Sequence, residues 1–246
     1  FRIGEYEKAM TIYSSVLKQS KETGDQYGIV TSLRAIGQVY TDKGQIDEAL
    51  DYYTRSLKIH EELGDKLKIA NSIIDIGNIY SNIGEYNKAL DNYTESLAIL
   101  ERLGETDNAG LIHNIGMIYR AKGDYDKSLE YFNHSLELVE EDASKSGIGY
   151  ILGKIGDIYH DKGDYDKAFE YYAQIIEKFK DIDDKTGLAW ILSRIGINYK
   201  FQGDYKTAVE YLEQSFTIQK KIDFMLFRLA TTAYLYFCNK NLGKEY

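Results

Sequence analysis

Apolar side chains recur along the chain at spacings of three and four residues, and short turns containing glycine separate the segments that show this spacing. One segment carries Ile69, Ile73, Ile76 and Tyr80. Because an α-helix makes one turn about every 3.6 residues, these four side chains lie on one helix face. Gly84 interrupts the pattern, and a second segment with the same spacing follows it. The pattern therefore predicts pairs of helices joined by short turns.

The helix pair repeats along the whole chain. Each repeat contains an Ile-Gly pair followed by Tyr three residues later, and the steps between the glycines of these pairs are 40, 39, 40 and 40 residues. We call them the marker glycines: Gly37, Gly77, Gly116, Gly156 and Gly196. A fixed period of this length is typical of a solenoid, in which each unit buries its apolar face against its neighbours. Binding, rather than catalysis, is the function expected of such an array.

We predict twelve helices in a single continuous array over residues 1–246. A leading helix at 5–20 precedes five helix pairs, and a trailing helix lies at about 222–241. The helix pairs are expected at about 25–62, 65–103, 106–141, 145–181 and 184–221. Both ends of the sequence match the middle of a repeat, so we expect a fragment of a longer protein with uncapped ends.

The marker glycines stand inside predicted helices, where glycine is unfavourable by about 1 kcal/mol relative to alanine. Their recurrence predicts close helix crossings. Each marker glycine has a small residue twelve positions later, and we expect the two to face each other so that the helix axes approach closely. The pairs are Gly37/Ala49, Gly77/Ala89, Gly116/Ser128, Gly156/Ala168 and Gly196/Ala208.

The composition is acidic, with 39 Asp and Glu against 30 Lys and Arg, which gives a formal net charge of −9. This charge argues against a general binder of nucleic-acid backbones. No apolar run is long enough to cross a bilayer, so we expect no membrane partner. Cys238 is the only cysteine, which excludes an internal disulfide and fits a reducing compartment. We therefore expect a cytoplasmic location.

The repeat resembles the tetratricopeptide repeat. The matching residues of the first full unit are Ile36-Gly37, Tyr40, Ala49, Tyr53 and Ser56. The period is longer than the usual 34 residues, and the proline that commonly ends the second helix is absent, so the units are more similar to those of kinesin light chains and prokaryotic signalling proteins. The resemblance implies an all-α, right-handed superhelical α-solenoid of antiparallel helix pairs, with the first helix of each pair lining an inner groove.

The resemblance also implies which residues line that groove. Four of them, Asn78, Asn114, Lys154 and Arg194, form a row of amides and cations, and such groups suit a peptide backbone and acidic side chains. Only Asn78, Asn114 and Lys154 match the carboxylate clamp of some family members. A solvated helix face is the alternative for each residue. The expected groove residues are Arg34, Asn78, His113, Asn114, Tyr150, Lys154, Asp157, Trp190 and Arg194.

Tyr150, Gly153 and Trp190 form a separate local feature on the expected groove side. One interpretation is a pocket for an anchoring side chain, formed where Gly153 leaves space beside two aromatic rings. The alternative is that Trp190 packs between the helices.

No arrangement typical of an enzyme is visible. The segment 147–153 resembles a glycine-rich nucleotide loop, but no predicted strand precedes it. The four histidines lack the spacing of metal ligands, and Cys238 stands among apolar residues, where we expect a buried structural thiol. We therefore predict a protein that is not an enzyme and that holds no cofactor or metal.

Two hypotheses for the function follow. The first is an interaction module that binds a protein or peptide segment in the groove, as the scaffold or sensor part of a larger protein. The second is a structural repeat array without a dedicated groove ligand, which associates end to end through its uncapped termini.

Overall fold

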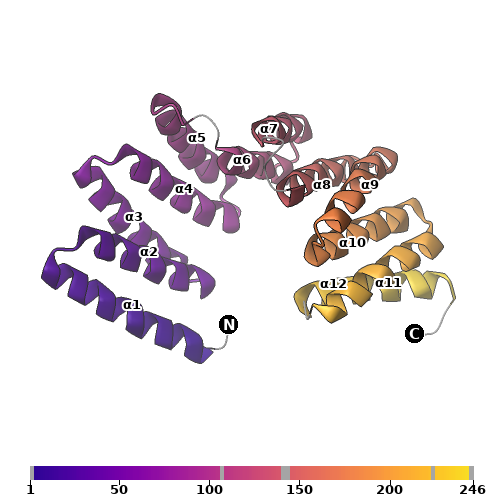
Figure 1. Cartoon of the computed structure of the whole chain (residues 1–246), viewed down its shortest axis with the longest axis horizontal. Helices are drawn as coiled ribbons and strands as arrows, with labels where there is room; N and C mark the ends of the chain where they lie inside the picture. Colours follow the sequence, from indigo (N-terminus) through magenta and orange to yellow (C-terminus); the bar gives the residue numbers. More distant parts are fainter. Residues whose placement is uncertain (1–2, 106–107, 140–144, 223–224, 244–246) are drawn as a thin grey trace. The chain divides into compact units, whose positions relative to one another are not determined.

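The chain folds into antiparallel helix pairs (Figure 1). A computed structural model describes residues 3–105, 108–139, 145–222 and 225–243, with the side chains of all but 3, 145, 146 and 225–227. These described residues form twelve α-helices and no strand. The all-α repeat fold expected from the sequence is therefore confirmed. The expected ranges 106–141 and 222–241 extend in part over residues outside the described ones.

A leading helix, α1 (Ile3–Thr23), precedes the pairs. The first helices of the pairs are α2 (Gln26–Asp42), α4 (Lys66–Asn82), α6 (Ala109–Ala121), α8 (Lys145–Asp161) and α10 (Lys185–Gln202). The second helices are α3 (Ile46–Leu63), α5 (Tyr86–Arg102), α7 (Tyr125–Leu138), α9 (Tyr165–Asp181) and α11 (Tyr205–Lys221). The trailing helix is α12 (Met225–Asn241).

The helices divide into two compact units. The N-terminal unit comprises Phe1–Leu111 and the C-terminal unit comprises Ile112–Tyr246. The most extensive packing within each unit joins helices that are adjacent in sequence, such as α4 with α5 and α10 with α11. The single continuous array and its superhelical sense stay predictions.

Several turns combine a glycine with an acidic residue, as the sequence suggests, whereas the turn between α9 and α10 has Asp183, with φ 50°, followed by Asp184. Gly64 has φ 70°, a left-handed conformation that glycine adopts without strain, and it ends α3. The next residue, Asp65, accepts a hydrogen bond from the backbone N–H of Lys68 at 3.1 Å, which caps α4. A glycine-aspartate junction also occurs within a pair, between α10 and α11, where Gly203 has φ 85° and Asp204 caps α11. These junctions set where α4 and α11 begin.

The marker glycines lie at close helix crossings, as predicted. A Cβ added at Gly77 would lie 2.7 Å from the ring of Tyr93, sixteen positions later, rather than nearest to Ala89. The Cα–Cβ direction explains this difference. It tilts toward the helix N-terminus, and in an antiparallel pair that direction leads one turn further along the second helix. Ala89 is itself fully buried, so the small residue completes the crossing while the ring covers the glycine.

Candidate functional site

The residue after each marker glycine forms a hydrogen bond with the side chain fifteen positions later when that side chain is tyrosine. Three repeats have such a bond: Tyr53 Oη with Gln38 Oε1 at 3.3 Å, Tyr93 Oη with Asn78 Oδ1 at 2.7 Å, and Tyr172 Oη with Asp157 Oδ1 at 2.9 Å. The other two repeats have an apolar residue at both positions. A buried hydroxyl is costly without a partner, so the two positions are polar or apolar together.

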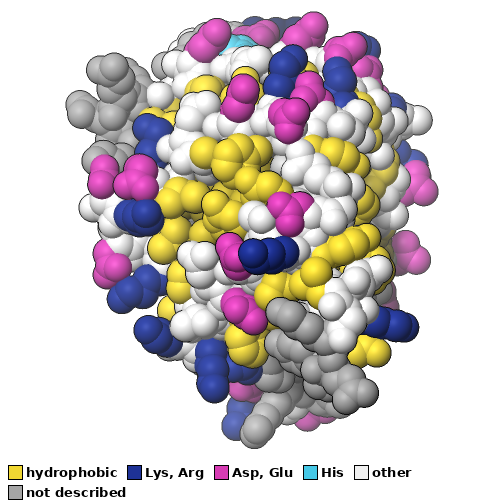
Figure 2. Space-filling model, turned by 90° about the vertical axis from the view of Figure 1, so that its right-hand side faces the viewer, with side chains coloured by type: hydrophobic (Ala, Val, Ile, Leu, Met, Phe, Trp, Pro, Cys, Tyr) yellow, Lys and Arg dark blue, Asp and Glu magenta, His cyan; other side chains and the backbone are white. Residues whose placement is uncertain are grey.

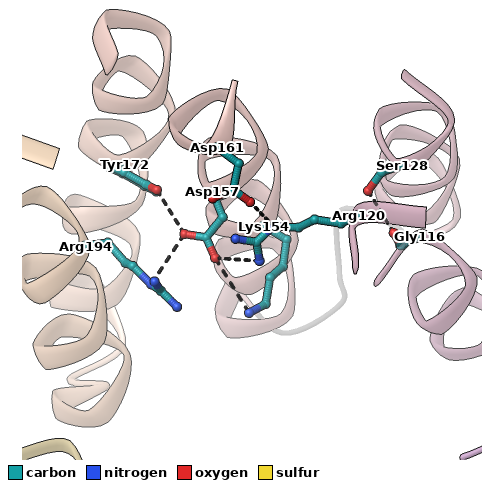
Figure 3. Close-up of polar contacts among 8 residues, drawn as sticks. All are labelled: Gly116, Arg120, Ser128, Lys154, Asp157, Asp161, Tyr172 and Arg194. Carbon is teal, nitrogen blue, oxygen red and sulfur yellow. Dashed lines mark hydrogen bonds and ion pairs between the residues drawn. The ribbon is translucent and has the colours of Figure 1, made fainter. Parts of the chain in front are cut away.

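Asp157 differs from its two counterparts because it carries a charge. Its side chain is 2% exposed, and its Oδ1 accepts the hydrogen bond from Tyr172 and pairs with Arg194 Nε at 3.4 Å. The other oxygen, Oδ2, lies 3.4 Å from Arg120 Nη1 and 3.8 Å from Lys154 Nζ. Figure 3 shows the three cationic side chains converging on this one carboxylate.

A second carboxylate completes the group. Asp161 accepts a hydrogen bond from Arg120 Nε at 2.7 Å. We call the group the Asp157 cluster: Arg120 on α6, Lys154, Asp157 and Asp161 on α8, Tyr172 on α9, and Arg194 on α10. Three cations face two carboxylates in it, which leaves a local charge of +1 in a chain whose net charge is −9.

Burial places the charges of the cluster unequally. The Asp157 side chain is 2% exposed, whereas the side chains of Arg120, Lys154 and Arg194 are 20%, 21% and 35% exposed. Burial lowers the pKa of Lys154, and although Asp157 acts to raise it, the charges of Arg194 and Arg120 lower it further. The excess positive charge therefore lies toward solvent, where an external anion would stabilise it.

Trp190 lies beneath two of these cations. The Lys154 Nζ is 5.5 Å and the Arg194 Cζ 5.9 Å from the centre of its ring. The indole is 7% exposed, and a Cβ added at Gly153 would lie 2.6 Å from its Cζ3 atom. The ring thus fills the space that Gly153 leaves. Trp190 therefore packs between the helices, which is the second of the two interpretations given above. Its ring occupies the space in which the first interpretation expected a pocket beside Gly153.

Tyr150 lies beside Trp190, and His113 is near enough to Lys154 to be affected by its charge. The Tyr150 ring lies 5.2 Å from the Trp190 ring. The His113 ring meets Phe132 edge-on at 5.1 Å, and its pKa is lowered by burial and then by the charge of Lys154. Asn114 is half-buried on α6. These residues belong to the C-terminal unit, as does the cluster.

Arg34 and Asn78 lie in the N-terminal unit. Arg34 Nε donates a hydrogen bond to Asp75 Oδ2 at 2.8 Å, which links α2 to α4. Asn78 accepts the hydrogen bond from Tyr93. The nine expected groove residues are thus divided between the two units. Among them, Lys154 and Arg194 both pair with the carboxylate of Asp157.

Arg120, Asp161 and Tyr172 were not among the expected site residues. A signal for two of them exists in the sequence. Arg120 and Asp161 are 41 positions apart, and Arg34 and Asp75 are also 41 apart. Opposite charges at this separation lie on successive first helices. A search for such pairs would have found Arg120 and Asp161.

Other parts of the described structure show less chemistry. Gly149 and Gly153, in the segment that resembles a nucleotide loop, lie within α8 under the rings of Phe179 and Trp190. Cys238 is buried, and burial raises the pKa of its thiol. No group of His, Cys, Asp or Glu in the described residues is placed to hold a metal ion. Among the helices described, none has the length and apolar character needed to span a membrane.

A large hollow lies apart from the Asp157 cluster. It has a volume of about 880 Å³ and is lined by residues of α9, α10 and α11, including Ile176, Leu188 and Leu192. None of its lining residues belongs to the cluster. Figure 2 shows how hydrophobic side chains gather on one face of the molecule with charges of both signs between them. We place the candidate site at the cluster, because three cations converge there on one buried carboxylate.

A family model described as tetratricopeptide repeat matches residues 1–62, 29–102, 107–180 and 147–221. No curated protein matches the chain closely enough to count as a relative. A signal transduction ATPase with numerous domains from Pyrococcus horikoshii, which has a tetratricopeptide repeat sensor, has a TM-score of 0.74 at 17% identity. The match covers 92% of this chain and 34% of that one.

Two further solved structures are similar in fold. The repeats of a putative kinesin light chain from Podosopora anserina have a TM-score of 0.67 at 17% identity, with coverage of 79% of this chain and 96% of that one. A Rap protein complexed with competence and sporulation factor has a TM-score of 0.64 at 17% identity, with coverage of 98% and 72%. The expected similarity to kinesin light chain repeats and signalling proteins is therefore confirmed at the level of the fold.

Proposed function

The chain belongs to the tetratricopeptide repeat family, and on that basis we propose that it binds a protein segment through the Asp157 cluster. Lys154 and Arg194 hold an acidic side chain or the terminal carboxylate of that segment. The chain is a protein-interaction repeat module, and the similar Rap protein, solved in complex with competence and sporulation factor, is consistent with ligand binding by this fold.

The positive excess of the cluster is the observation that supports this proposal. Asp157 is buried and holds three cations in defined positions, while two carboxylates leave one positive charge uncompensated. An ammonium carries three N–H donors and a guanidinium five, which is more than the contacts with Asp157 use. Charge-assisted hydrogen bonds to a carboxylate are stronger than neutral ones. Because the cations are already in place, little conformational entropy is lost when the ligand binds.

The net charge of the chain limits the ligand to a small anionic group. A long polyanion would meet the overall charge of −9 and be repelled by it. A single carboxylate on a peptide meets chiefly the local excess near Lys154, because charges farther away than about 10 Å are screened at moderate salt. The cluster therefore favours an acidic residue within a protein segment over a nucleic-acid backbone.

The test compares matched peptides. Fluorescein-labelled peptides selected from a random library by capture on the protein are resynthesised with each Glu or Asp replaced by Gln or Asn. We expect the acidic version to bind more tightly, and Lys154→Ala or Arg194→Ala to weaken it about tenfold. Lys206→Ala, which removes an equal charge from α11, serves as the control. Equal binding of acid and amide peptides, or an equal loss in Lys206→Ala, would contradict the proposal.

Self-association is the second candidate, and exposed apolar side chains favour it. Ile12 and Val16 on α1 are 59% and 43% exposed, and Leu229 and Tyr236 on α12 are 66% and 57% exposed. Apolar surfaces of this kind tend to find a partner. Sedimentation velocity over a wide concentration range distinguishes the candidates: a concentration-independent monomer excludes self-association and leaves the peptide hypothesis untouched.

A further inference from the structure

We propose that Trp190 is the positioning residue of this anion site, because its indole ring holds the Lys154 and Arg194 side chains where a carboxylate can reach both. This inference rests on the proposed function of the Asp157 cluster. It assigns a role to the chain's one tryptophan that burial in a core does not by itself require.

The contacts place both cations on the ring. The centre of the ring is 5.5 Å from Lys154 Nζ and 5.9 Å from Arg194 Cζ. A cation within about 6 Å of a ring centre is attracted by the quadrupole of the ring, and tryptophan gives the strongest attraction of the aromatic residues. The two side chains come from α8 and α10, so the ring brings together charges from two successive first helices.

The ring itself is held in place from several sides. Gly153 leaves the space into which the indole fits, and the Tyr150 ring packs against it at 5.2 Å. Tyr150 is supported in turn by Phe179 at 5.5 Å. A side chain that is 7% exposed and packed in this way has one orientation, so the cations above it inherit a defined position.

An aromatic ring can hold the two cations without neutralising them, which a third carboxylate could not do. A carboxylate under Lys154 and Arg194 would hold them in place but would also cancel the positive excess that attracts the ligand. The ring attracts both cations and carries no net charge. The cluster therefore keeps its charge of +1 and gains order at the same time.

Comparison among the repeats supports a local role for this ring. The residue six positions before the marker glycine is polar or small in the first three repeats and aromatic in the last two. In chain order these residues are Thr31, Asn71, Gly110, Tyr150 and Trp190. A feature needed only for packing the repeat would be expected in all of them. The tryptophan instead occurs once, in the C-terminal unit, which contains the Asp157 cluster and its excess positive charge.

The first measurement needs no ligand. Protons held above an aromatic ring are shifted upfield, so the ε-methylene resonances of Lys154 in the NMR spectrum should be upfield of those of exposed lysines. In Trp190→Leu this shift should disappear. If the resonances of Lys154 in the wild type are not shifted, the Lys154 side chain does not lie over the Trp190 ring and the inference is wrong.

The second measurement uses the captured acidic peptide and three variants. We expect Trp190→Phe to weaken binding about threefold and Trp190→Leu about tenfold, because the cation–ring attraction decreases in that order. Trp190→Phe keeps a ring in the same place and serves if Trp190→Leu does not fold. Phe201→Leu is the control, since Lys200 Nζ lies 4.1 Å from the Phe201 ring on the same helix, α10, outside the cluster.

The outcomes separate the two proposals. An upfield Lys154 resonance together with graded losses in affinity supports the role of Trp190. Affinity that is unchanged in a folded Trp190→Phe and Trp190→Leu, or reduced equally by Phe201→Leu, overturns it even if the resonance is shifted. A wild-type protein that binds no acidic peptide overturns the proposed function. The Lys154 resonance then still decides whether the Lys154 side chain lies over the Trp190 ring.

Discussion

The N-terminal and C-terminal units surround equivalent tyrosine hydroxyls with opposite charge. Tyr53 in the N-terminal unit and Tyr172 in the C-terminal unit each donate from the same repeat position to the residue after a marker glycine. One cation and two carboxylates surround the first hydroxyl, which gives −1, and three cations and two carboxylates accompany the second, which gives +1. These residues are Arg34, Asp42 and Asp75 in the first unit, and Arg120, Lys154, Asp157, Asp161 and Arg194 in the second.

The comparison shows that the repeats of the two units keep the tyrosine hydrogen bond but differ in the charges around it. Both phenols stay neutral hydrogen-bond donors, because burial and then the nearest carboxylate raise the pKa of Tyr53 to about 12 and also raise the pKa of Tyr172. The helix pair thus supplies the same kind of tyrosine donor in both units. The charged residues around it differ between the two units, so each unit has its own electrostatic character.

The largest effect is expected when Asp157 is removed. Asp157→Ala leaves three cations and the Tyr172 hydroxyl without their common acceptor, and loss of a buried partner of this kind costs about 2–4 kcal/mol of unfolding free energy once the partial exposure of the cations is allowed for. Asn78→Ala removes the neutral counterpart in the N-terminal unit and should cost about 1–2 kcal/mol. Urea denaturation of both variants measures the difference. Equal costs would show that the charges of the cluster add no stability.

The next effect compares marker glycines of the two units. A Cβ at Gly77 would lie 2.7 Å from the Tyr93 ring, whereas one at Gly116 would lie 3.3 Å from Tyr131 and 3.4 Å from Phe132. Gly77→Ala should therefore destabilise by about 1–3 kcal/mol through overpacking. Gly116→Ala should change stability by less than about 1 kcal/mol, because the helical preference of alanine offsets the small strain. Thermal unfolding monitored by circular dichroism tests the order, and the reverse order would refute it.

Neutralising Asp157 without removing its shape should sharpen the contrast in charge. Asp157→Asn raises the local charge of the C-terminal unit from +1 to +2, so we expect the captured acidic peptide to bind about threefold to tenfold more tightly at low ionic strength. The gain should disappear as salt is added. Fluorescence anisotropy titrations at two salt concentrations measure both effects. Weaker binding by a folded Asp157→Asn would mean that the carboxylate is needed to position the cations.

The smallest effect concerns a buried histidine of the N-terminal unit. His60 Nδ1 lies 2.8 Å from Ser72 Oγ, and burial and then the charge of Lys68 lower the pKa of His60. In the unfolded chain His60 takes up a proton near its ordinary pKa of about 6.5, so the unfolded state binds protons first as pH falls. The stabilising contribution is therefore complete above about pH 6.5 and is lost progressively below it.

The C-terminal unit provides the control for this histidine. At the equivalent position Gln219 Nε2 donates to Thr231 Oγ1 at 3.0 Å, a pair that does not titrate. His60→Gln should keep a hydrogen bond to Ser72 and reduce the loss of melting temperature between about pH 7.5 and pH 5 by a few degrees. An identical pH dependence in the variant and the wild type would assign the acid sensitivity to other groups.

Local patterns in the sequence predicted the helix pairs and some of the turn residues between them, although α1 runs from Ile3 to Thr23 rather than over 5–20. Apolar spacing placed Ile69, Ile73 and Ile76 on one buried face of α4, and Gly64 followed by Asp65 marked the junction between α3 and α4. Such features depend on neighbours within a few residues, so a single sequence contains the information. For the marker glycines, the sequence predicted a close helix crossing. It did not predict which side chain covers the glycine, such as the Tyr93 ring at Gly77.

The Asp157 cluster depends on the tertiary structure. Its members come from four helices, and Arg120 and Asp161 are 41 residues apart. Whether such side chains meet depends on the rotation of each helix and on side-chain torsions, which local spacing does not determine. Sequence alone therefore determined the repeat, the helix pairs and the chemical types available on the first helices. Packing of successive pairs decided that three cations share one buried carboxylate, because an ion pair forms only when both side chains reach the same point in space.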